Sequence, residues 1–381
     1  MGLVDDHPAA MLHRAVLLFA VSAVLAVPAE ARRRSVGTRS PFPPCSMITG
    51  SGAVTFTHDH GLTLAPAAVP ARPISYTYGV ATMPDEPKTV VAWHRDDLLI
   101  STDSGCSWRV AATVRGSDFP PKLEPAGGGR VYAWSENRPF LVRYDARGAV
   151  KLKPPADFVG FTADPANGDR ARAGGVDGSL WETLDAGESW TRIGAHTVAP
   201  LYYRFAFNPQ NLDHILAGTV SHGAFVSRDA GRTWTRANGI APRGNANVFQ
   251  VLFSPADPNR VWAMGINNEE SRDGHPSHGR HIYLSDDGGA NFRPVIDEAP
   301  GVKLINGPTM AAHPQNRELL YFVFGTHIFD YGTDFFRYDA ATGALTMTHN
   351  QYDGINSIAF SRTDPTLLYL GIETIAEDST Q

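Results

Sequence analysis

Polar and aromatic residues of the types that bind ligands in proteins recur between the short apolar runs of this chain. Arginine, histidine, asparagine and tyrosine supply hydrogen bonds and charge to peptides, sugars and carboxylates. We predict a ligand-binding face that draws on His94, Arg95, Tyr203, Arg204, His222, Arg243, Asn245, His327, Asp330 and Tyr352. The chain has no Ser-His-Asp nucleophile elbow, phosphate loop or dinucleotide fingerprint. We therefore assign no catalytic residue and no cofactor, and favour a protein that is not an enzyme.

The longest polar insertion is the segment Ile266–His281. It places His275, His278 and His281 three residues apart, close to acidic residues, and these are the side chains that bind zinc. The histidine spacing lies on a loop interrupted by glycine and proline, not on a helix, and it matches no zinc motif. We predict a polar lid or a partner-contact loop and keep the histidines as weak metal candidates.

Four octets in the chain share the pattern Ser/Thr-x-Asp-x-Gly-x-x-aromatic. The Asp carboxylate accepts backbone N–H groups inside a turn, Gly supplies a positive φ, and the aromatic residue begins a returning strand. Each octet therefore predicts a β-hairpin. The aspartates of these octets, with that of a fifth and weaker copy placed first, are Asp59, Asp103, Asp185, Asp229 and Asp287.

Each octet is one hairpin of a larger repeat, and the other strands and turns of that repeat carry the candidate residues. Upstream of a typical octet lie two apolar strands joined by a Pro-Asp/Asn turn, so the unit has four strands and returns every 40–58 residues. Degenerate hairpins at Asp145 and Asp339 bring the number of units to seven. We predict an all-β fold, a seven-bladed β-propeller of four-stranded antiparallel blades.

The two ends of the repeat region are incomplete in a complementary way. The region starts with a final hairpin only and stops after the first two strands of a unit. A composite blade made from the N- and C-terminal strands would close the ring without an exposed sheet edge. A solenoid or a pair of sandwiches is the alternative, but it leaves both half-units unexplained.

The octets resemble the Asp-box, or BNR, repeats of sialidases, sortilin-type receptors, xyloglucan-degrading enzymes and photosystem II assembly factors. The resemblance covers essentially all of residues 51–374 and implies that the octet aspartates are structural. In such propellers these turns lie on one face. The opposite face, here called the loop face, is built from the turns between second and third strands and from the connections between blades. We expect any ligand there.

The resemblance leaves three functions to weigh. We favour a secreted, non-catalytic propeller that binds a protein or glycan through its loop face. A sialidase- or xyloglucanase-like glycoside hydrolase acting at the central channel is the first alternative; Arg95, Arg204 and Arg243 beside Tyr203 are residue types that a sialidase requires. However, the Arg-Ile-Pro signature of sialidases is absent, and xyloglucan enzymes use two propellers. An assembly factor for a membrane complex is the second alternative, but it predicts a basic patch, whereas the arginines are scattered.

The N-terminal residues predict export. An apolar stretch, Ala15–Val27, precedes the small-x-small sequence at Ala29–Ala31, as in a cleaved signal peptide. The stretch is shorter than the ~20 residues that span a bilayer. We expect a signal peptide at 1–31, with Met11 as an alternative start, then an N-terminal arm at 32–50, the propeller at 51–374 and a tail at 375–381.

Composition bears on the kind of partner, and the two cysteines bear on a disulfide. The net charge of −6 argues against nucleic acid, and 43% apolar residues argue against disorder. In an oxidising compartment Cys45 and Cys106 are expected to form a disulfide. We expect a secreted or periplasmic monomer that does not insert into a membrane after cleavage, with an extracellular or periplasmic protein or glycan as its partner.

Overall fold

The computed structural model describes residues 54–60, 65–66, 77–116, 121–195, 197–304, 309–326, 332–350 and 353–374. The chain divides into two compact units, residues 1–38 and 39–381, and every described residue belongs to the second. The predicted signal peptide, N-terminal arm and C-terminal tail lie outside the described residues. Among the helices that are described, none has the length and hydropathy needed to cross a bilayer.

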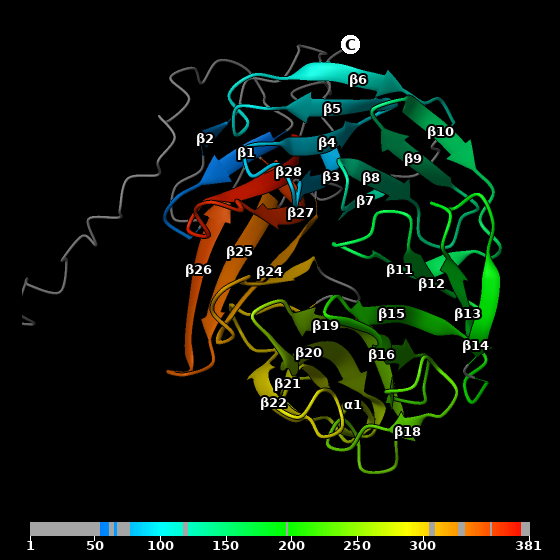
Figure 1. Ribbon diagram of the computed structural model, residues 1–381. Helices are drawn as coiled ribbons and strands as arrows, with labels where there is room; N and C mark the ends of the chain where they lie inside the picture. The colour runs from blue at the N-terminus through cyan, green and yellow to red at the C-terminus, as the bar shows by residue number, and fades with distance from the viewer. Residues whose placement is uncertain are drawn as a thin grey trace, which may run out of the picture. The chain divides into compact units, whose positions relative to one another are not determined.

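The described strands form seven four-stranded antiparallel sheets, which follow one another around a central axis (Figure 1). The predicted seven-bladed β-propeller is confirmed. The first strand of each blade faces the centre; in chain order these are β3 (Thr77–Thr82), β7 (Lys122–Ala126), β11 (Phe158–Ala163), β15 (Tyr202–Asn208), β19 (Ala246–Ser254), β23 (Met310–Ala312) and β27 (Asp353–Phe360).

The other strands step outward from the centre in sequence order. The second strands are β4 (Val90–His94), β8 (Arg130–Trp134), β12 (Ala171–Gly175), β16 (Asn211–Thr219), β20 (Asp257–Asn267), β24 (Leu319–Thr326) and β28 (Leu368–Thr374). The third strands are β5 (Asp97–Ser101), β9 (Leu141–Asp145), β13 (Ser179–Thr183), β17 (Ala224–Ser227), β21 (Arg280–Ser285), β25 (Gly332–Asp339) and β1 (Val54–Thr57). The fourth strands are β6 (Arg109–Thr113), β10 (Gly148–Leu152), β14 (Thr191–Ala195), β18 (Thr235–Arg236), β22 (Arg293–Asp297), β26 (Ala344–Asn350) and β2 (Ala65–Pro66).

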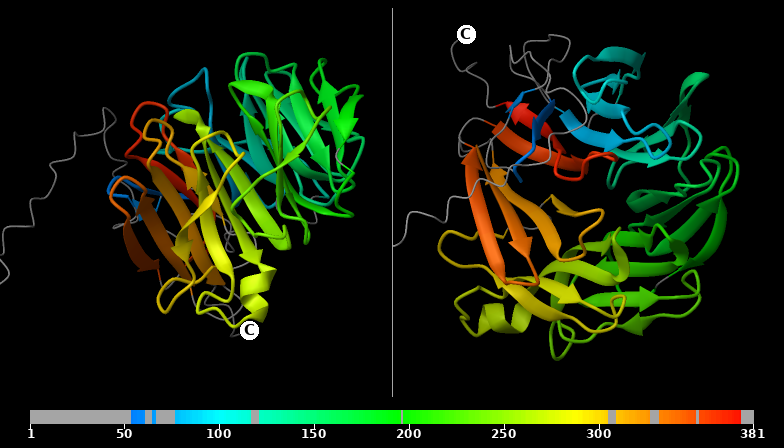
Figure 2. Two further views of the ribbon diagram at one scale, coloured as in Figure 1. Left: turned by 90° about the horizontal axis from the view of Figure 1, so that it is seen from below. Right: turned by 60° about the vertical axis from the view of Figure 1, so that its left-hand side comes forward.

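The seventh blade is the predicted composite. Its strand order is β2-β1-β28-β27, and β1 pairs antiparallel with β28 so that Phe56 lies opposite Tyr369 (Figure 2). Val54, Phe56 and Tyr369 are buried in one apolar cluster. The pairing covers the edge of β28, which would otherwise present unpaired N–H and C=O groups.

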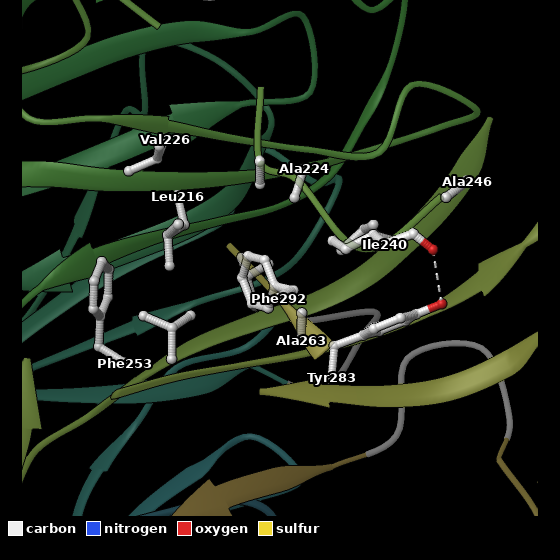
Figure 3. Close-up of a cluster of buried hydrophobic side chains, with 13 residues drawn as sticks. Leu216, Ala224, Val226, Ile240, Ala246, Phe253, Ala263, Tyr283 and Phe292 are labelled. Carbon is white, nitrogen blue, oxygen red and sulfur yellow. Dashed lines mark hydrogen bonds between the residues drawn. The ribbon is translucent and has the colours of Figure 1, made fainter. Parts of the chain in front are cut away.

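The core lies between neighbouring blades rather than within one sheet. Figure 3 shows the cluster between the blades that begin with β15 and β19, where Leu216 of one blade lies near Phe253 of the next, and Tyr283 lies at the other end of the cluster beside Ile240. The Tyr283 hydroxyl donates to the Ile240 carbonyl oxygen at 3.2 Å, so the phenol is buried with a partner. Each blade therefore stabilises its neighbours, as in other repeat architectures.

The octet turns have the chemistry predicted for them. In the turn of Asp229, one carboxylate oxygen accepts from the Ser227 hydroxyl at 2.8 Å and the Thr233 N–H at 2.9 Å, and the other accepts from the Thr233 hydroxyl at 2.7 Å. Gly231 has a φ of 82°, and the residue before it, Ala230, is also left-handed at 61°. The sequence pattern predicted only the first of these two positions. The equivalent bonds recur at Asp103, Asp185 and Asp287.

Candidate functional site

A cavity of about 740 Å³ lies on the axis of the propeller, and we call it the channel cavity. The first strand of every blade contributes to its wall. The contributions include Gly79, Lys122, Phe161, Arg204, Gln250, Met310 and Ser357. Several of these residues stand near the beginning of their strands, and Glu136 reaches the cavity from the turn between β8 and β9. The channel cavity thus lies toward the loop face.

A second cavity of about 600 Å³ adjoins the first and extends toward the opposite face. The two share a mainly apolar neck that includes Leu123, Leu252 and Ile358, together with the carboxyl group of Glu124. Beyond the neck the wall is rich in prolines from the turns between first and second strands. The channel is therefore polar at the loop face and mainly apolar at its waist.

Four polar side chains in the channel cavity contact one another. Lys122 Nζ lies 2.9 Å and Arg204 Nη1 lies 2.5 Å from the same oxygen, Glu136 Oε1. Arg204 also donates from Nε to Gln250 Oε1 at 2.9 Å, and the Lys122 ammonium lies 5.6 Å from the centre of the Trp134 ring. This set, which we call the channel cluster, joins residues of three blades.

The channel cluster alters the acidity of its members. Burial and the nearby Arg204 guanidinium lower the pKa of Lys122 to about 8, although 40% of the side chain is exposed to the space in the channel. Burial alone would disfavour the ionised form of Glu136, but Arg204 and Lys122 outweigh it and lower the pKa of that carboxyl. Glu136 is therefore ionised at neutral pH.

A second carboxyl group in the same cavity has the opposite character. Burial raises the pKa of Glu124 to about 8, against the effect of the Ala163 N–H, which donates to Oε1 at 3.3 Å, and of Arg362. Glu124 is therefore protonated at neutral pH while Glu136 is charged. Two carboxyl groups with separated pKa values in one cavity can act as a proton donor and an anion.

Arg204 was predicted to belong to the ligand-binding face, and it lines the channel cavity. Its neighbour Tyr203 points elsewhere, with its ring 4.7 Å from that of Phe249 between two blades. His94 is only 3% exposed, at the end of β4, and Arg95 follows it in the turn to β5. Of Arg95, Arg204 and Arg243, the arginines considered for a sialidase-like site, Arg204 alone is among the lining residues of the channel cavity.

Three further candidates lie outside the channel wall, on the loop face. Arg243 is exposed in the connection to β19, and Asn245 Oδ1 accepts from the Asn268 amide at 2.9 Å. His222 lies in the turn between β16 and β17, with Nδ1 2.8 Å from the Val220 carbonyl oxygen. The predicted residues His327, Asp330 and Tyr352 lie outside the described residues.

Sequence reasoning missed most of the channel cluster. Lys122 and Gln250 are polar residues within first strands. Glu124, which lines the same cavity outside the channel cluster, lies two positions after Lys122 on the same strand. A comparison of the first strands of the repeats would have provided a signal, because Lys122, Arg204 and Gln250 interrupt apolar strands that must face the axis.

The insertion lies where it was predicted, between β20 and β21, but it contains a short helix, α1 (Asn268–Arg272). Asn267 caps it by accepting from the Glu269 N–H at 3.1 Å. The three histidines lie beyond this helix, with His275 and His278 in the connection to β21 and His281 within that strand, so their spacing does not lie on a helix. His281 is buried between Glu270 and Asp297, at 2.6 and 2.7 Å. His275 and His278 are exposed, and within the described ranges no three His, Cys, Asp or Glu residues converge as metal ligands.

Cys106 lies in the octet turn between β5 and β6 and is half-buried. Cys45 lies outside the described residues, so the disulfide between them remains a prediction.

Comparisons with known proteins agree with the fold. The Sortilin-Vps10 family model (sortilin, neurotensin receptor 3) matches residues 178–336. The GH74 xyloglucanase from Xanthomonas campestris superposes with a TM-score of 0.56 at 14% identity, over 82% of this chain and 54% of that one, so this chain spans about half its length. YCF48 bound to D1 peptide superposes with a TM-score of 0.53 at 13% identity, over 80% of this chain and 98% of that one. At these identities the likeness shows the fold alone.

One relative is similar along nearly its whole length. The dispase autolysis-inducing protein of Streptomyces mobaraensis is 44% identical over 352 residues, which cover 91% of this chain and 93% of the relative. The match therefore includes the channel as well as the octets. On this similarity, the chain belongs to the family of the dispase autolysis-inducing protein.

Proposed function

We propose that this protein is an exported, non-catalytic β-propeller that binds a protease through its loop face and promotes self-digestion of that protease. The observation that carries the proposal is the 44% identity to a protein named for inducing autolysis of dispase. Because the aligned region covers 91% of the chain, it includes the loop face as well as the structural turns.

The geometry supports binding more than catalysis. In the channel cluster the Glu136 carboxylate is held by Lys122 and Arg204, and Arg204 by Gln250. A rigid ring that presents loops of different composition on one face is suited to recognise a macromolecule. An exported location is consistent with the predicted signal peptide and with an exported protease as partner.

The direct test is to incubate the purified protein with dispase and follow intact protease by gel electrophoresis. We expect intact dispase to disappear several times faster than in its absence, while the propeller itself remains whole. Heat-denatured propeller at the same concentration is the control for non-specific effects. An unchanged lifetime of dispase at a molar excess of native propeller would refute the proposal.

A glycoside hydrolase is the second candidate, and the carboxyl pair in the channel cavity favours it. The protonated Glu124 would act as the acid and the ionised Glu136 as the anion, as two-carboxylate glycosidases require. The ion pairs of Glu136 with Lys122 and Arg204 weigh against this, because they reduce its power as a nucleophile or base. Hydrolysis of fluorogenic glycosides, lost in Glu124→Gln, would establish the activity; rates equal to buffer across a panel that includes sialosides and xyloglucan fragments would exclude it.

A further inference from the structure

The channel cavity places two cations, Lys122 and Arg204, in contact with one carboxylate, Glu136. Its charged lining residues are Lys122, Arg204, Glu124 and Glu136. Burial holds Glu124 in its uncharged form because its pKa is raised to about 8. Two cations therefore face one carboxylate, inside a space whose volume lies in the usual range for ligand sites.

Glu136 occupies the position that a carboxylate from outside would take. One of its oxygens serves both cations, at 2.9 Å from Lys122 Nζ and 2.5 Å from Arg204 Nη1. A lysine has three N–H donors and an arginine five, so the two cations offer more donors than one carboxylate oxygen can accept. Glu136 itself comes from a turn of the loop face and is 32% exposed, so it reaches inward from the rim and is accessible to displacement.

Gln250 fixes the orientation of the receiving group. Its Oε1 accepts from Arg204 Nε at 2.9 Å, which sets the plane of the guanidinium. A guanidinium of fixed plane is pre-organised to bind a carboxylate through two parallel hydrogen bonds.

Two exposed apolar side chains lie in the connection that leads into β15, the strand that carries Arg204. Val198 and Leu201 are 52% and 50% exposed, in the connection that leads into β15, and Arg204 follows Leu201 by three residues. The segment is held in place, because the Val220 N–H donates to the Leu201 carbonyl oxygen at 3.2 Å. Exposed apolar side chains in a connection of the loop face can provide contacts to a partner.

The geometry points to an acidic segment of the partner protease as the occupant of the channel cavity, with its carboxylate on Lys122 and Arg204 in place of Glu136 and an adjacent apolar residue on Val198 and Leu201. This inference rests on the proposed function and names the contact through which it operates. A basic segment is disfavoured, because it would bring cations next to Lys122 and Arg204.

Binding of fluorescein-labelled hexaglutamate, measured by fluorescence anisotropy at pH 7, tests the site without any protease. We expect wild-type protein to bind the peptide, and Lys122→Met and Arg204→Gln each to weaken binding about tenfold, as expected for loss of a charged hydrogen bond. Glu136→Gln should strengthen it, because the competing carboxylate is gone. Lys88→Met is the matched control: Lys88 is an exposed lysine in the turn between β3 and β4, away from the loop face, and its loss should leave binding unchanged.

Lys122→Met is expected to lower the affinity for the peptide and Glu136→Gln to raise it. Misfolding would lower the affinity in both variants, so the two effects distinguish recognition from misfolding. Melting curves of all variants are recorded alongside. Equal affinity in wild type and Lys122→Met, weaker binding in Glu136→Gln, or preference for hexalysine would each overturn the inference. So would promotion of dispase autolysis by Lys122→Met at the wild-type rate, and that result would leave the proposed function intact. Failure of the wild-type protein to promote autolysis would instead refute the proposed function.

Discussion

At the scale of single residues, His313 links the stability of the propeller to pH. The side chain is 7% exposed, and its Nδ1 accepts from the backbone N–H groups of Gln315 and Asn316 at 3.1 and 3.0 Å. Protonation of Nδ1 would break both bonds. Burial, and then the neighbouring His60 and Arg337, lower the pKa of His313 to about 4.

Because this pKa is lowered on folding, the folded state binds fewer protons than the unfolded state below about pH 6.5. Stability should therefore fall between about pH 6.5 and 4, by up to about 3 kcal/mol from this group. His313→Asn keeps a side-chain acceptor for the turn but does not titrate. We expect urea denaturation of the variant at pH 7 and pH 4.5 to show a smaller loss of unfolding free energy than wild type; parallel losses would contradict the assignment.

At the scale of elements, the octet turns and the channel strands have separate tasks. The bonds of the turns link residues no more than four apart, so each turn is complete within its own hairpin. This locality is why the sequence predicted these turns, their aspartates and the number of blades. In the channel cluster the direct partners of Arg204 are Gln250, 46 positions away, and Glu136, 68 positions away, and no local pattern encodes such a meeting.

Asp229→Ala tests the structural role of an octet. The change removes the acceptor of two hydrogen bonds from Thr233 and one from Ser227, and we expect a loss of about 1–2 kcal/mol in unfolding free energy. Promotion of dispase autolysis by the folded variant should be unchanged. Arg232→Ala, at an exposed residue of the same turn, is the control and should alter stability by less than about 0.5 kcal/mol. A stable Asp229→Ala variant without activity would show that this aspartate serves function.

At the scale of the whole molecule, the complementary half-units allowed the closed ring to be predicted, because only joining the two ends removes both open edges. The wall of the channel was not predictable in the same way. Lys122, Arg204 and Gln250 meet because the ring turns the first strands of three blades toward one axis, and the rotation of each blade is set by packing such as that of Phe253 and Tyr283. The positions of Tyr203 and His94 away from the channel have the same origin.

The predicted disulfide also belongs to this scale, because it would tie the N-terminal arm to the blade that begins with β3. Mass spectrometry of the exported protein after alkylation without reductant should find no modified cysteine, and a peptide linking Cys45 to Cys106 after digestion. Cys106→Ser should lower stability by roughly 2–4 kcal/mol, as loss of a native disulfide commonly does. Alkylation of both cysteines in the native protein would contradict the pairing.

The pairing of β1 with β28 has a consequence for folding during synthesis of the chain. The first of these strands leaves the ribosome more than 300 residues before the second, since Thr57 pairs with Leu368. The last blade therefore cannot assemble until the chain has been synthesised as far as β28, and contacts so distant along a chain form slowly. Until then the edge of β1 that pairs with β28 has no partner strand, so the ring closes only at the end of folding.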